Sequence, residues 1–541
     1  MLLAEVAATS DAVAATRSRL AKRAAIADLL RRTADGAGGA APSDAGVADP
    51  ADDLEIVVAY LAGALRQRRT GLGYAALRDL PPPSSDATLT VRDVDAAFAA
   101  MAALEGPGSG QDRSTAAAEL FGAATEREQA FLRGLVAGEL RQGALDSVVV
   151  DAIAEAAGVP ADAVRRAVML RGATGPVASA ALLAEEPLAA LAGFTLEVGR
   201  PVRPMLAQSA PDIAAAFEKL SGGEPAELCV DVKLDGIRIQ VHRLGDEVRV
   251  VTRSLDDITE RVPEIVDVVR ALPSDRLVLD GEALGVGPDG VPRPFQETAA
   301  RSATHESGRG SARGPARATS AEEALADQFQ LTPFFFDVLH ADGRDLLDAP
   351  LRERLAVLDE VAGPHTVRRL LTSDADEAAE FFAGALREGQ EGVVIKSLDT
   401  PYAAGRRGAG WVKVKPRKTL DLVVLAVERG SGRRQGWLSN IHLGARDPEG
   451  GFVMLGKTFK GMTDQMLQWQ TERFRELEVE DDGWVVTVRP EQVVEIAFDG
   501  LQRSTRYPGG LALRFARVLR YRDDKTAAEA DTIDTVRSLA V

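Results

Sequence analysis

The spacing of hydrophobic residues predicts that the front of the chain is helical. Apolar side chains recur at every third or fourth position, which is typical of one buried face of an α-helix. This period covers the segments Leu2–Leu30, Leu54–Leu65, Thr115–Leu140, Ser147–Ala157 and Ala161–Leu170. Pro160 precedes the last segment and suits the first turn of a helix. We therefore expect an all-α domain over residues 1–200.

The hydrophobic pattern changes to short β-type runs beyond Arg200. The runs are bounded by Gly, Asp or Pro, as strands commonly are. They are LCVDVKLDGIRIQVHR, EVRVVTRS, RLVLDGEALG, FQLTPFFFDVL, GVVIKSL and WVKVKPRK. A helical period returns at Pro263–Ala271 and Asp374–Arg387, so the mixture predicts an α+β domain over residues 201–418. Its low-complexity segment Arg301–Glu323 is expected to be a mobile surface insertion.

The last part of the chain contains at least five further strand-like runs. They are LDLVVLAVERG, SNIHLGARD, GFVMLGKTF, WVVTVRPEQVVEIAFDG and LALRFARVLRYR. One helical segment, Thr463–Leu477, interrupts them. A five-stranded barrel with an inserted helix is the pattern of the OB-fold, which often binds nucleic acids. We therefore predict an OB-fold β-barrel over residues 419–541.

Charge and cysteine content narrow the class of protein. The 541 residues carry 64 Lys and Arg against 81 Asp and Glu, a net charge of -17, which excludes a protein that coats DNA with diffuse positive charge. A local basic groove stays open, because local phosphate contacts decide binding. The single cysteine, Cys229, excludes a disulfide framework and a four-cysteine zinc site within the chain. The absence of a long apolar run and of a basic leader favours a cytoplasmic protein.

A series of short motifs carries the candidate chemistry. It begins with Asp231-Val-Lys233-Leu-Asp235-Gly236-Ile-Arg238, a lysine at the end of a strand before a tight turn. Alone, this pattern equally fits a β-hairpin with an ordinary exposed lysine. It is followed in order by Thr252-Arg253-Ser254, Asp280-Gly281-Glu282, Phe336-Asp337, Glu391-Gly392, Lys396, Trp411-Val-Lys413-Val-Lys415, Arg514-Phe-Ala-Arg517 and Arg522-Asp-Asp524-Lys525. The fixed order of so many motifs argues against coincidence.

This ordered set resembles the covalent nucleotidyltransferase superfamily of ATP-dependent DNA ligases and mRNA capping enzymes. The similarity is closest to three-domain bacterial and archaeal-type ATP-dependent DNA ligases. It covers nearly the whole chain, because Gly138–Gly143 resembles part of that family's N-terminal DNA-binding domain. The resemblance implies a helical DNA-binding domain over 1–200, a nucleotidyltransferase (adenylation) domain over 201–418 and an OB-fold domain over 419–541.

The resemblance also implies the reaction and its setting. The expected enzyme is an ATP-dependent DNA ligase that seals nicks in double-stranded DNA during replication, recombination or repair. It is expected to act as a nucleoid-associated cytoplasmic monomer that encircles DNA. Lys233 is implied as the nucleophile that becomes lysyl-AMP. A free lysine amine has a pKa near 10.4, and nearby cations would lower that pKa and expose the nucleophilic lone pair.

The family pattern assigns the other site residues. It implies ATP contacts by Asp231, Arg238, Arg253, Glu282, Phe336, Arg407, Lys413, Lys415, Arg514 and Lys525. It implies Mg²⁺ or Mn²⁺ bound by Glu282 and Glu391, and DNA contacts by Arg141 and Arg517. Three alternatives stay open: Phe336 as a core residue of PFFFDVL, Lys413 and Lys415 on a solvated edge strand, and Arg141 as a solvated helix-end arginine.

The same residues disfavour three other functions. A capping guanylyltransferase or an RNA ligase would share the nucleotide motifs but is disfavoured by the long helical front part. An NAD-dependent ligase is disfavoured because its four-cysteine zinc module has no counterpart here. A non-catalytic DNA clamp should have lost its nucleophile, whereas Lys233, Glu282, Glu391 and Lys413 are all present.

Overall fold

The computed structural model describes most of the chain. The described residues are 1–36, 50–67, 70–73, 77–138, 140, 142, 146–287, 292–293, 295, 297–299, 330–403, 407–416, 418–431 and 434–539. They pack into two compact units. The first contains residues 1–209, 216–378 and 394–413, and the second contains residues 210–215, 379–393 and 414–541.

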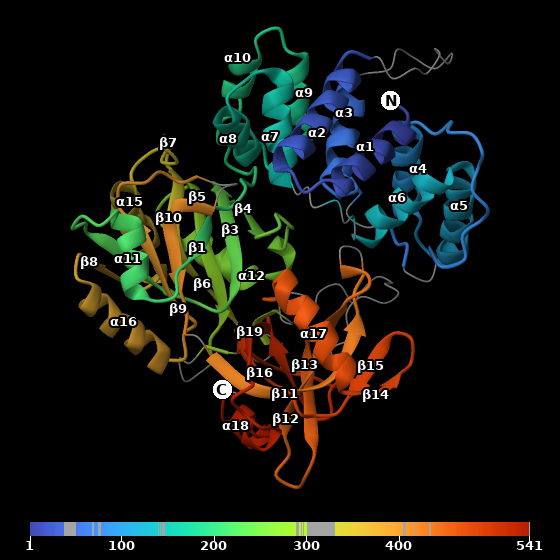
Figure 1. Cartoon of the computed structure of the whole chain (residues 1–541). Coiled ribbons are helices and arrows are strands. Elements are labelled where there is room, and N and C mark those ends of the chain that lie inside the picture. The colour runs from blue at the N-terminus through green and yellow to red at the C-terminus, as the bar shows by residue number, and fades with distance from the viewer. Residues whose placement is uncertain are drawn as a thin grey trace. The chain divides into compact units, whose positions relative to one another are not determined.

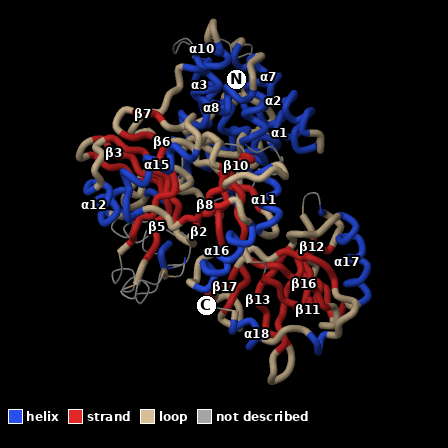
Figure 2. Tube along the Cα trace, turned by 90° about the vertical axis from the view of Figure 1, so that its left-hand side faces the viewer, coloured by secondary structure: helices blue, strands red, loops and turns tan. Residues whose placement is uncertain are grey.

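The front of the first unit consists of packed helices, as the hydrophobic period predicts (Figures 1 and 2). The helices are α1 (Leu3–Ala15), α2 (Arg19–Ala34), α3 (Pro50–Leu61), α4 (Val91–Ala103), α5 (Ser109–Ala123), α6 (Glu126–Ala137), α7 (Asp146–Ala157), α8 (Ala161–Arg171), α9 (Gly175–Leu183) and α10 (Pro187–Ala192). The predicted segment Leu2–Leu30 is two helices, because Ser18 caps α2 by accepting the N–H of Ala21. None of the helices in the described ranges is long and apolar enough to cross a membrane.

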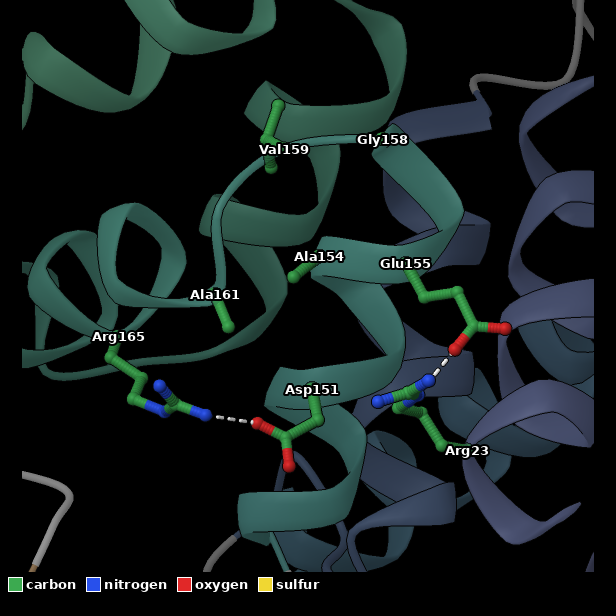
Figure 3. Close-up of a pocket in the computed structure, with 8 residues that line it drawn as sticks. All are labelled: Arg23, Asp151, Ala154, Glu155, Gly158, Val159, Ala161 and Arg165. Atoms are coloured by element: carbon green, nitrogen blue, oxygen red, sulfur yellow. Dashed lines mark hydrogen bonds and ion pairs between the residues drawn. The ribbon is translucent and has the colours of Figure 1, made fainter. Parts of the chain in front are cut away.

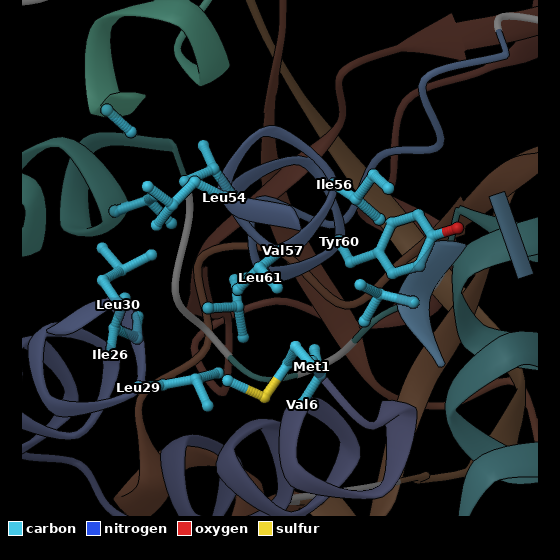
Figure 4. Packing of buried hydrophobic residues seen from close by; sticks show 14 of the residues in the cluster. Met1, Val6, Ile26, Leu29, Leu30, Leu54, Ile56, Val57, Tyr60 and Leu61 are labelled. Atoms are coloured by element: carbon cyan, nitrogen blue, oxygen red, sulfur yellow. The ribbon is translucent and has the colours of Figure 1, made fainter. Parts of the chain in front are cut away.

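Apolar side chains from these helices form one continuous core. Leu29 and Leu30 of α2 pack with Leu54 and Val57 of α3, and all four are fully buried. Figure 4 shows these residues pointing toward one another, with Met1 and Tyr60 beside them. The apolar face predicted from the three-to-four spacing is therefore the face that the helices bury.

The rest of the first unit is built on two sheets. One is antiparallel, with strand order β4-β3-β5-β6-β7, and contains β3 (Ile237–Leu244), β4 (Glu247–Thr252), β5 (Arg276–Gly285), β6 (Leu331–Ala341) and β7 (Arg344–Asp345). The other has the order β1-β10-β9-β2-β8 and contains β1 (Leu206–Ser209), β2 (Leu228–Lys233), β8 (Arg369–Thr372), β9 (Gly392–Ser397) and β10 (Arg407–Val414). Helices α11 (Ile213–Ser221), α12 (Pro263–Ala271), α15 (Leu351–Ala362) and α16 (Ala375–Arg387) connect the strands, although most of α16 and the first residues of α11 are grouped with the second unit. The predicted α+β character is confirmed.

The second unit is dominated by a seven-stranded antiparallel sheet. Its path β13-β12-β11-β15-β14 is extended by β16, which pairs with β11 and β19. The strands are β11 (Lys418–Arg429), β12 (Leu438–Arg446), β13 (Phe452–Thr458), β14 (Glu478–Asp481), β15 (Val485–Val488), β16 (Val493–Phe498) and β19 (Arg517–Tyr521). A separate hairpin joins β17 (Gly500–Arg503) to β18 (Leu511–Arg514), and α17 (Asp464–Glu476) and α18 (Ile533–Ser538) complete the unit.

The predicted strands and inserted helix of this unit are present, but barrel closure is not. Helix α17 lies within one residue of the predicted Thr463–Leu477 at each end. Among the described strands, no pairing joins the two ends of the sheet. The observed feature is therefore a strongly bent sheet, in which β11 pairs with β16 through Lys418–Val423 and with β12 through Val423–Arg429.

A fully buried ion pair fastens α15 to β6. The Arg354 guanidinium donates to both carboxylate oxygens of Asp337, at 2.8 and 3.1 Å, and both side chains are 0% exposed. Arg354 also donates to the carbonyls of Ala349 and Thr400 at 2.6 and 3.0 Å. Because each charge has its partner inside the protein, removing either one would strand the other in a dry interior.

We expect Arg354→Ala to destabilise the protein by about 3–5 kcal/mol, because it leaves the Asp337 carboxylate buried without a counter-charge. Urea unfolding followed by circular dichroism measures the loss. The matched control is Arg344→Ala, which breaks an exposed pair with Glu353 at 2.8 Å. That exposed pair should contribute less than about 1 kcal/mol. Equal losses in the two variants would contradict the structural role of the buried pair.

Candidate nucleotide-binding site

Lys233 is the last residue of strand β2 and lies half-buried beside a tight turn. Its Nζ donates to the carbonyl of Leu234 at 3.4 Å. Alternation along β2 puts Asp231 and Lys233 on the same face of the strand. Lys233 is therefore not the ordinary exposed hairpin lysine that the short motif alone permits.

Two glycines of the motifs are required by the close packing of β3, β5 and β6. A Cβ on Gly236 would lie 2.3 Å from the carbonyl oxygen of Ala283 and 2.9 Å from Cγ of Glu282. A Cβ on Gly281 would lie 2.7 Å from the carbonyl oxygen of Phe334. Both contacts are closer than heavy atoms tolerate, so only glycine lets β3, β5 and β6 approach at these points. The lack of space for a Cβ explains why glycine follows aspartate in both motifs.

Arg238 on β3 is held by a bidentate ion pair with Asp280 on β5. Its Nε and Nη2 donate to the two oxygens of Asp280 at 3.0 and 2.6 Å, and the Asp280 side chain is 1% exposed. The cross-strand register places Arg238 opposite Glu282. The motif arginine and the motif glutamate are therefore neighbours, although they are 44 residues apart in the sequence.

Tyr402 and Met205 join this ion pair into a closed ring of hydrogen bonds. The Tyr402 hydroxyl donates to Asp280 Oδ2 at 2.7 Å and accepts the N–H of Met205 at 2.9 Å. Arg238 Nη1 in turn donates to the carbonyl of Met205 at 2.7 Å. Sequence reasoning missed Tyr402, Met205 and the structural use of Asp280. The one available signal was that Tyr402 is the only tyrosine between residues 201 and 418.

Phe336 lies half-buried next to this ring, whereas Phe335 is the fully buried core residue of the same strand. The Phe336 ring packs edge-to-face against Trp411 with centroids 5.8 Å apart. The Arg238 guanidinium lies 5.4 Å from the centroid of Phe336, a cation–π distance. Strand alternation thus separates the two phenylalanines, and Phe336 faces the side that carries the motif residues.

The Asp231 carboxylate is buried and forms ion pairs with cations of its own domain. Lys396 of β9 approaches its Oδ2 at 2.6 Å, and Arg369 of β8 approaches Oδ1 at 3.9 Å. Lys396 Nζ also donates to the carbonyl of Phe336 at 3.0 Å and lies 4.5 Å from the centroid of Trp411. The Asp231 carboxylate therefore anchors Lys396 beside the aromatic pair of Phe336 and Trp411.

The electrostatics of the site favour a nucleophilic lysine. Burial lowers the pKa of Lys233, and the positive charges of Arg238 and Arg253 lower it further, while Glu282 and Asp235 oppose that change. Burial raises the pKa of Glu282 to about 7, against the opposing pull of Lys233 and Arg238. Arg253 is exposed in the turn after β4, so its guanidinium is accessible to a ligand phosphate.

The basic strand predicted near residue 413 is β10. Trp411 is buried and Lys413 half-buried, on the face opposite to the buried Val412 and Val414. The division between the compact units falls after Lys413, so Lys415 belongs to the second unit. Arg407 begins β10, but its side chain lies outside the described residues, as do Arg141 and the segment Arg301–Glu323.

In the second unit the predicted functional cations pair with nearby acids. Lys415 forms an ion pair with Glu391 and lies 3.9 Å from Asp499. Arg517 lies 3.5 Å from Asp499, and Lys525 lies 2.6 Å from Asp421. Arg514 stacks over the exposed ring of Phe515, with its Cζ 5.9 Å from the centroid. Any anionic ligand of these cations must compete with their present carboxylate partners.

A hollow lies within the helical part, and the residues that line it are far from these motifs in the sequence. Its volume is about 420 Å³, and its lining includes Arg23, Asp151, Glu155 and Arg165. Figure 3 shows Arg23 directed at Glu155 and Arg165 directed at Asp151, the latter at 2.5 Å. Its charges cancel in pairs and it contains no nucleophile, so it is a poor candidate for the chemistry.

Comparisons with known proteins identify the family of the chain. The family model described as "ATP dependent DNA ligase domain" matches residues 204–415, "ATP dependent DNA ligase C terminal region" matches 434–525, and "DNA ligase N terminus" matches 74–154. A "Probable DNA ligase" of Beutenbergia cavernae is 73% identical over 100% of both chains. Another of Nocardioides sp. is 62% identical over 99% of each chain. The solved structure Pmar-Lig_PreS3 has the same fold, with a TM-score of 0.59 at 18% identity over 96% of this chain and 99% of its own.

The strand-rich part of the first unit is thus a nucleotidyltransferase domain, preceded by a helical region and followed by a C-terminal sheet domain. The chain belongs to the ATP-dependent DNA ligase family, whose members seal nicks in DNA. The predicted family and enzyme class are confirmed, which answers the capping-enzyme, NAD-dependent and non-catalytic alternatives.

The charge of Glu282 should set the pH dependence of self-adenylation. Because its negative charge raises the pKa of Lys233, Glu282→Gln should lower that pKa, and the amine would then deprotonate at lower pH. In a plot of the single-turnover adenylation rate against pH, the part where the rate rises should move to lower pH. This shift is expected whatever the substitution does to the maximum rate. Glu353→Gln, which removes an exposed carboxylate paired with Arg344, should leave the position of the rise unchanged. A rise that stays fixed or moves to higher pH in Glu282→Gln would refute this coupling.

Proposed function

We propose that Lys233 is the nucleophile of this ligase and carries AMP as a covalent intermediate. Its Nζ attacks the α-phosphorus of ATP, the new N–P bond replaces the bond from that phosphorus to the bridging oxygen, and pyrophosphate leaves. The amine proton passes to solvent. The observation that carries this proposal is the place of Lys233, half-buried at the end of β2 before the Asp235-Gly236 turn, within the residues that match the ATP-dependent DNA ligase domain. Burial and two arginine charges lower its pKa, which favours the nucleophilic amine.

Two further transfers complete the sealing reaction. The 5′-phosphate of the nick attacks the lysyl-AMP phosphorus, which frees Lys233 and gives a 5′-5′ pyrophosphate-linked adenylate on DNA. The 3′-hydroxyl then attacks the DNA phosphate, and AMP leaves as the phosphodiester forms. The protein mainly positions these groups and neutralises their charge, as phosphoryl transfer requires.

The remaining site residues serve the nucleotide in this proposal. Phe336 offers its exposed face to adenine, and the backbone near Asp231 reads the base edge. Oxygens of the ribose and phosphates are assigned to Arg238, Arg253, Glu282, Arg407, Lys413 and Lys415. The cluster of cations around Lys233 supports this assignment, because the triphosphate carries about four negative charges.

A divalent metal ion is general for the family, and the residues of this chain fit one bound mainly through substrate oxygens. Among the described residues, no three His, Cys, Asp or Glu side chains gather into a ready metal cage. Mg²⁺ commonly takes one or two carboxylates and completes its shell with phosphates and water. We assign Glu282 and Glu391 as those carboxylates for Mg²⁺ or Mn²⁺. The ion would neutralise developing phosphate charge, and Glu391 must release Lys415 to bind it.

The parts of the chain are assigned separate tasks. Residues 1–200, with Arg141, bind nicked double-stranded DNA, residues 201–418 perform adenylation, and residues 419–541 form an OB-fold that contacts DNA through Arg517. We propose a monomer that encircles DNA in the cytoplasm at the nucleoid and serves replication, recombination or repair. The helical and sheet-rich composition of the successive parts supports this division.

Lys233→Ala should abolish covalent labelling by α-labelled ATP and sealing of ordinary nicks. A nick that already carries the adenylate bypasses the lost step, so its sealing should persist in part. Gel assays of the label and of both substrates measure these outcomes. The control, Lys219→Ala, removes an exposed lysine of α11 and should label normally. A covalent adenylate on the Lys233→Ala variant would disprove the assignment.

We further propose that Arg514 and Lys525 orient the leaving pyrophosphate when the second unit closes over ATP. Lys525 is held by Asp421 near the start of β11, and the mobile joint of this closure is assigned to Lys418–Asp421, directly after the basic strand. Triphosphate oxygens would replace Asp421 as the partner of Lys525. Domain closures of this kind take place in microseconds to milliseconds.

Arg514→Ala and Lys525→Ala should slow self-adenylation by about tenfold or more while changing sealing of a pre-adenylated nick by less than about threefold, because only the first step releases pyrophosphate. Parallel rate measurements on the two substrates test this. Arg537→Ala, which removes an exposed arginine paired with Asp534, serves as the control. Equal losses in both assays would overturn the lid role and leave the ligase assignment intact.

A further inference from the structure

The guanidinium of Arg238 is only partly used by the protein. Arginine has five N–H donors in a rigid fork. Asp280 takes one from Nε and one from Nη2, and the carbonyl of Met205 takes one from Nη1. Two donors stay available on the fork, and the side chain keeps 16% of its surface exposed. The direction of those two donors therefore depends on how firmly Asp280 and Met205 hold the other three.

We infer that Tyr402 is a positioning residue of the nucleotide site, which acts through Asp280 and Met205 to aim the free donors of Arg238. This inference rests on the proposed contact between Arg238 and the nucleotide. Tyr402 touches both of the groups that hold Arg238. Its hydroxyl donates to Asp280 Oδ2 at 2.7 Å and accepts from Met205 N at 2.9 Å.

The hydroxyl is well suited to this double contact. Tyr402 is 2% exposed, so water does not compete for its hydrogen bonds. Burial and the charge of Asp280 raise the pKa of the phenol well above 10, so the group stays protonated and remains a donor. The ring packs edge-to-face on Trp411 at 5.9 Å, and Trp411 packs on Phe336. The aromatic ring of Tyr402 therefore fixes the position of its hydroxyl, and the hydroxyl fixes the Asp280 carboxylate.

The ring of hydrogen bonds spans segments far apart in the chain. Met205 precedes β1, Arg238 is on β3, Asp280 is on β5, and Tyr402 precedes β10. Each of the four groups is hydrogen-bonded to two of the others, and such closed buried networks fix geometry more firmly than separate pairs. Loss of the Tyr402 hydroxyl would open the ring at two points while leaving the Arg238–Asp280 pair in place.

The test is the kinetics of self-adenylation by Tyr402→Phe in the full chain. Phenylalanine keeps the ring against Trp411 and removes only the hydroxyl. We expect KM for ATP to rise about tenfold with kcat within about twofold, because a misdirected Arg238 weakens ground-state and transition-state binding alike. Tyr521→Phe is the matched control, since it removes a buried hydroxyl bonded to Gln470 at 2.5 Å in the second unit. That control should leave KM unchanged.

A double-mutant cycle separates positioning from packing. Lysine lacks the fork, so Arg238→Lys should itself raise KM for ATP. If Tyr402 acts through Arg238, Tyr402→Phe should cause no further rise in the Arg238→Lys protein. Multiplicative effects of the two substitutions would overturn the inference. So would an unchanged KM in Tyr402→Phe with a lowered melting temperature, which indicates packing alone. If Arg238→Lys leaves KM for ATP unchanged, the proposed contact between Arg238 and the nucleotide is itself disproved.

Discussion

The buried carboxylate of Asp280 is the constraint around which the candidate site is built. A carboxylate with 1% exposure costs several kcal/mol in a dry interior unless it is fully paired. Here Arg238 supplies the charge and two hydrogen bonds, and Tyr402 supplies a third. The backbone of Met205 accepts a further hydrogen bond from Arg238 and donates one to the Tyr402 hydroxyl. The four groups bind β3 and β5 of one sheet to the segments before β1 and β10 of the other.

A second charge network lies beneath the aromatic pair and depends on the first. Lys396 is neutralised by Asp231 and lies against the rings of Phe336 and Trp411, while Arg238 approaches the same two rings. Two cations thus share one aromatic surface, and each is compensated by its own buried carboxylate. The result is a site in which both cations are held by buried carboxylates of the protein. Its nearby arginine charges lower the pKa of Lys233, and burial lowers it more.

The charged side chains of the second unit are paired differently from those around Asp280. Its cations are partly exposed and are paired with acids of the same unit, as Lys525 is with Asp421 and Lys415 with Glu391. Such pairs contribute little to stability at the surface. They exchange partners at small cost, which is what the proposed transient phosphate contacts of these residues require. In a chain of net charge -17, this pairing also keeps basic side chains from attracting anions indiscriminately.

The sequence by itself determined the local elements and the family. Helical periodicity located α2, α7 and α8, and strand-like runs located β3, β5 and β11, because both signals are carried by neighbours in the chain. Ordered motifs identified the ligase family and predicted Lys233, Arg238, Glu282 and Phe336 as one site, and the structure places these residues in the same domain. Only the tertiary structure decided which residues hold them. Asp280 and Tyr402 are 122 residues apart, and Asp231 and Lys396 are 165 apart, so no period or spacing links them. The predicted closure of the C-terminal barrel also lay beyond the sequence, because closure depends on strand tilt and register across the whole sheet rather than on the pattern of any one strand.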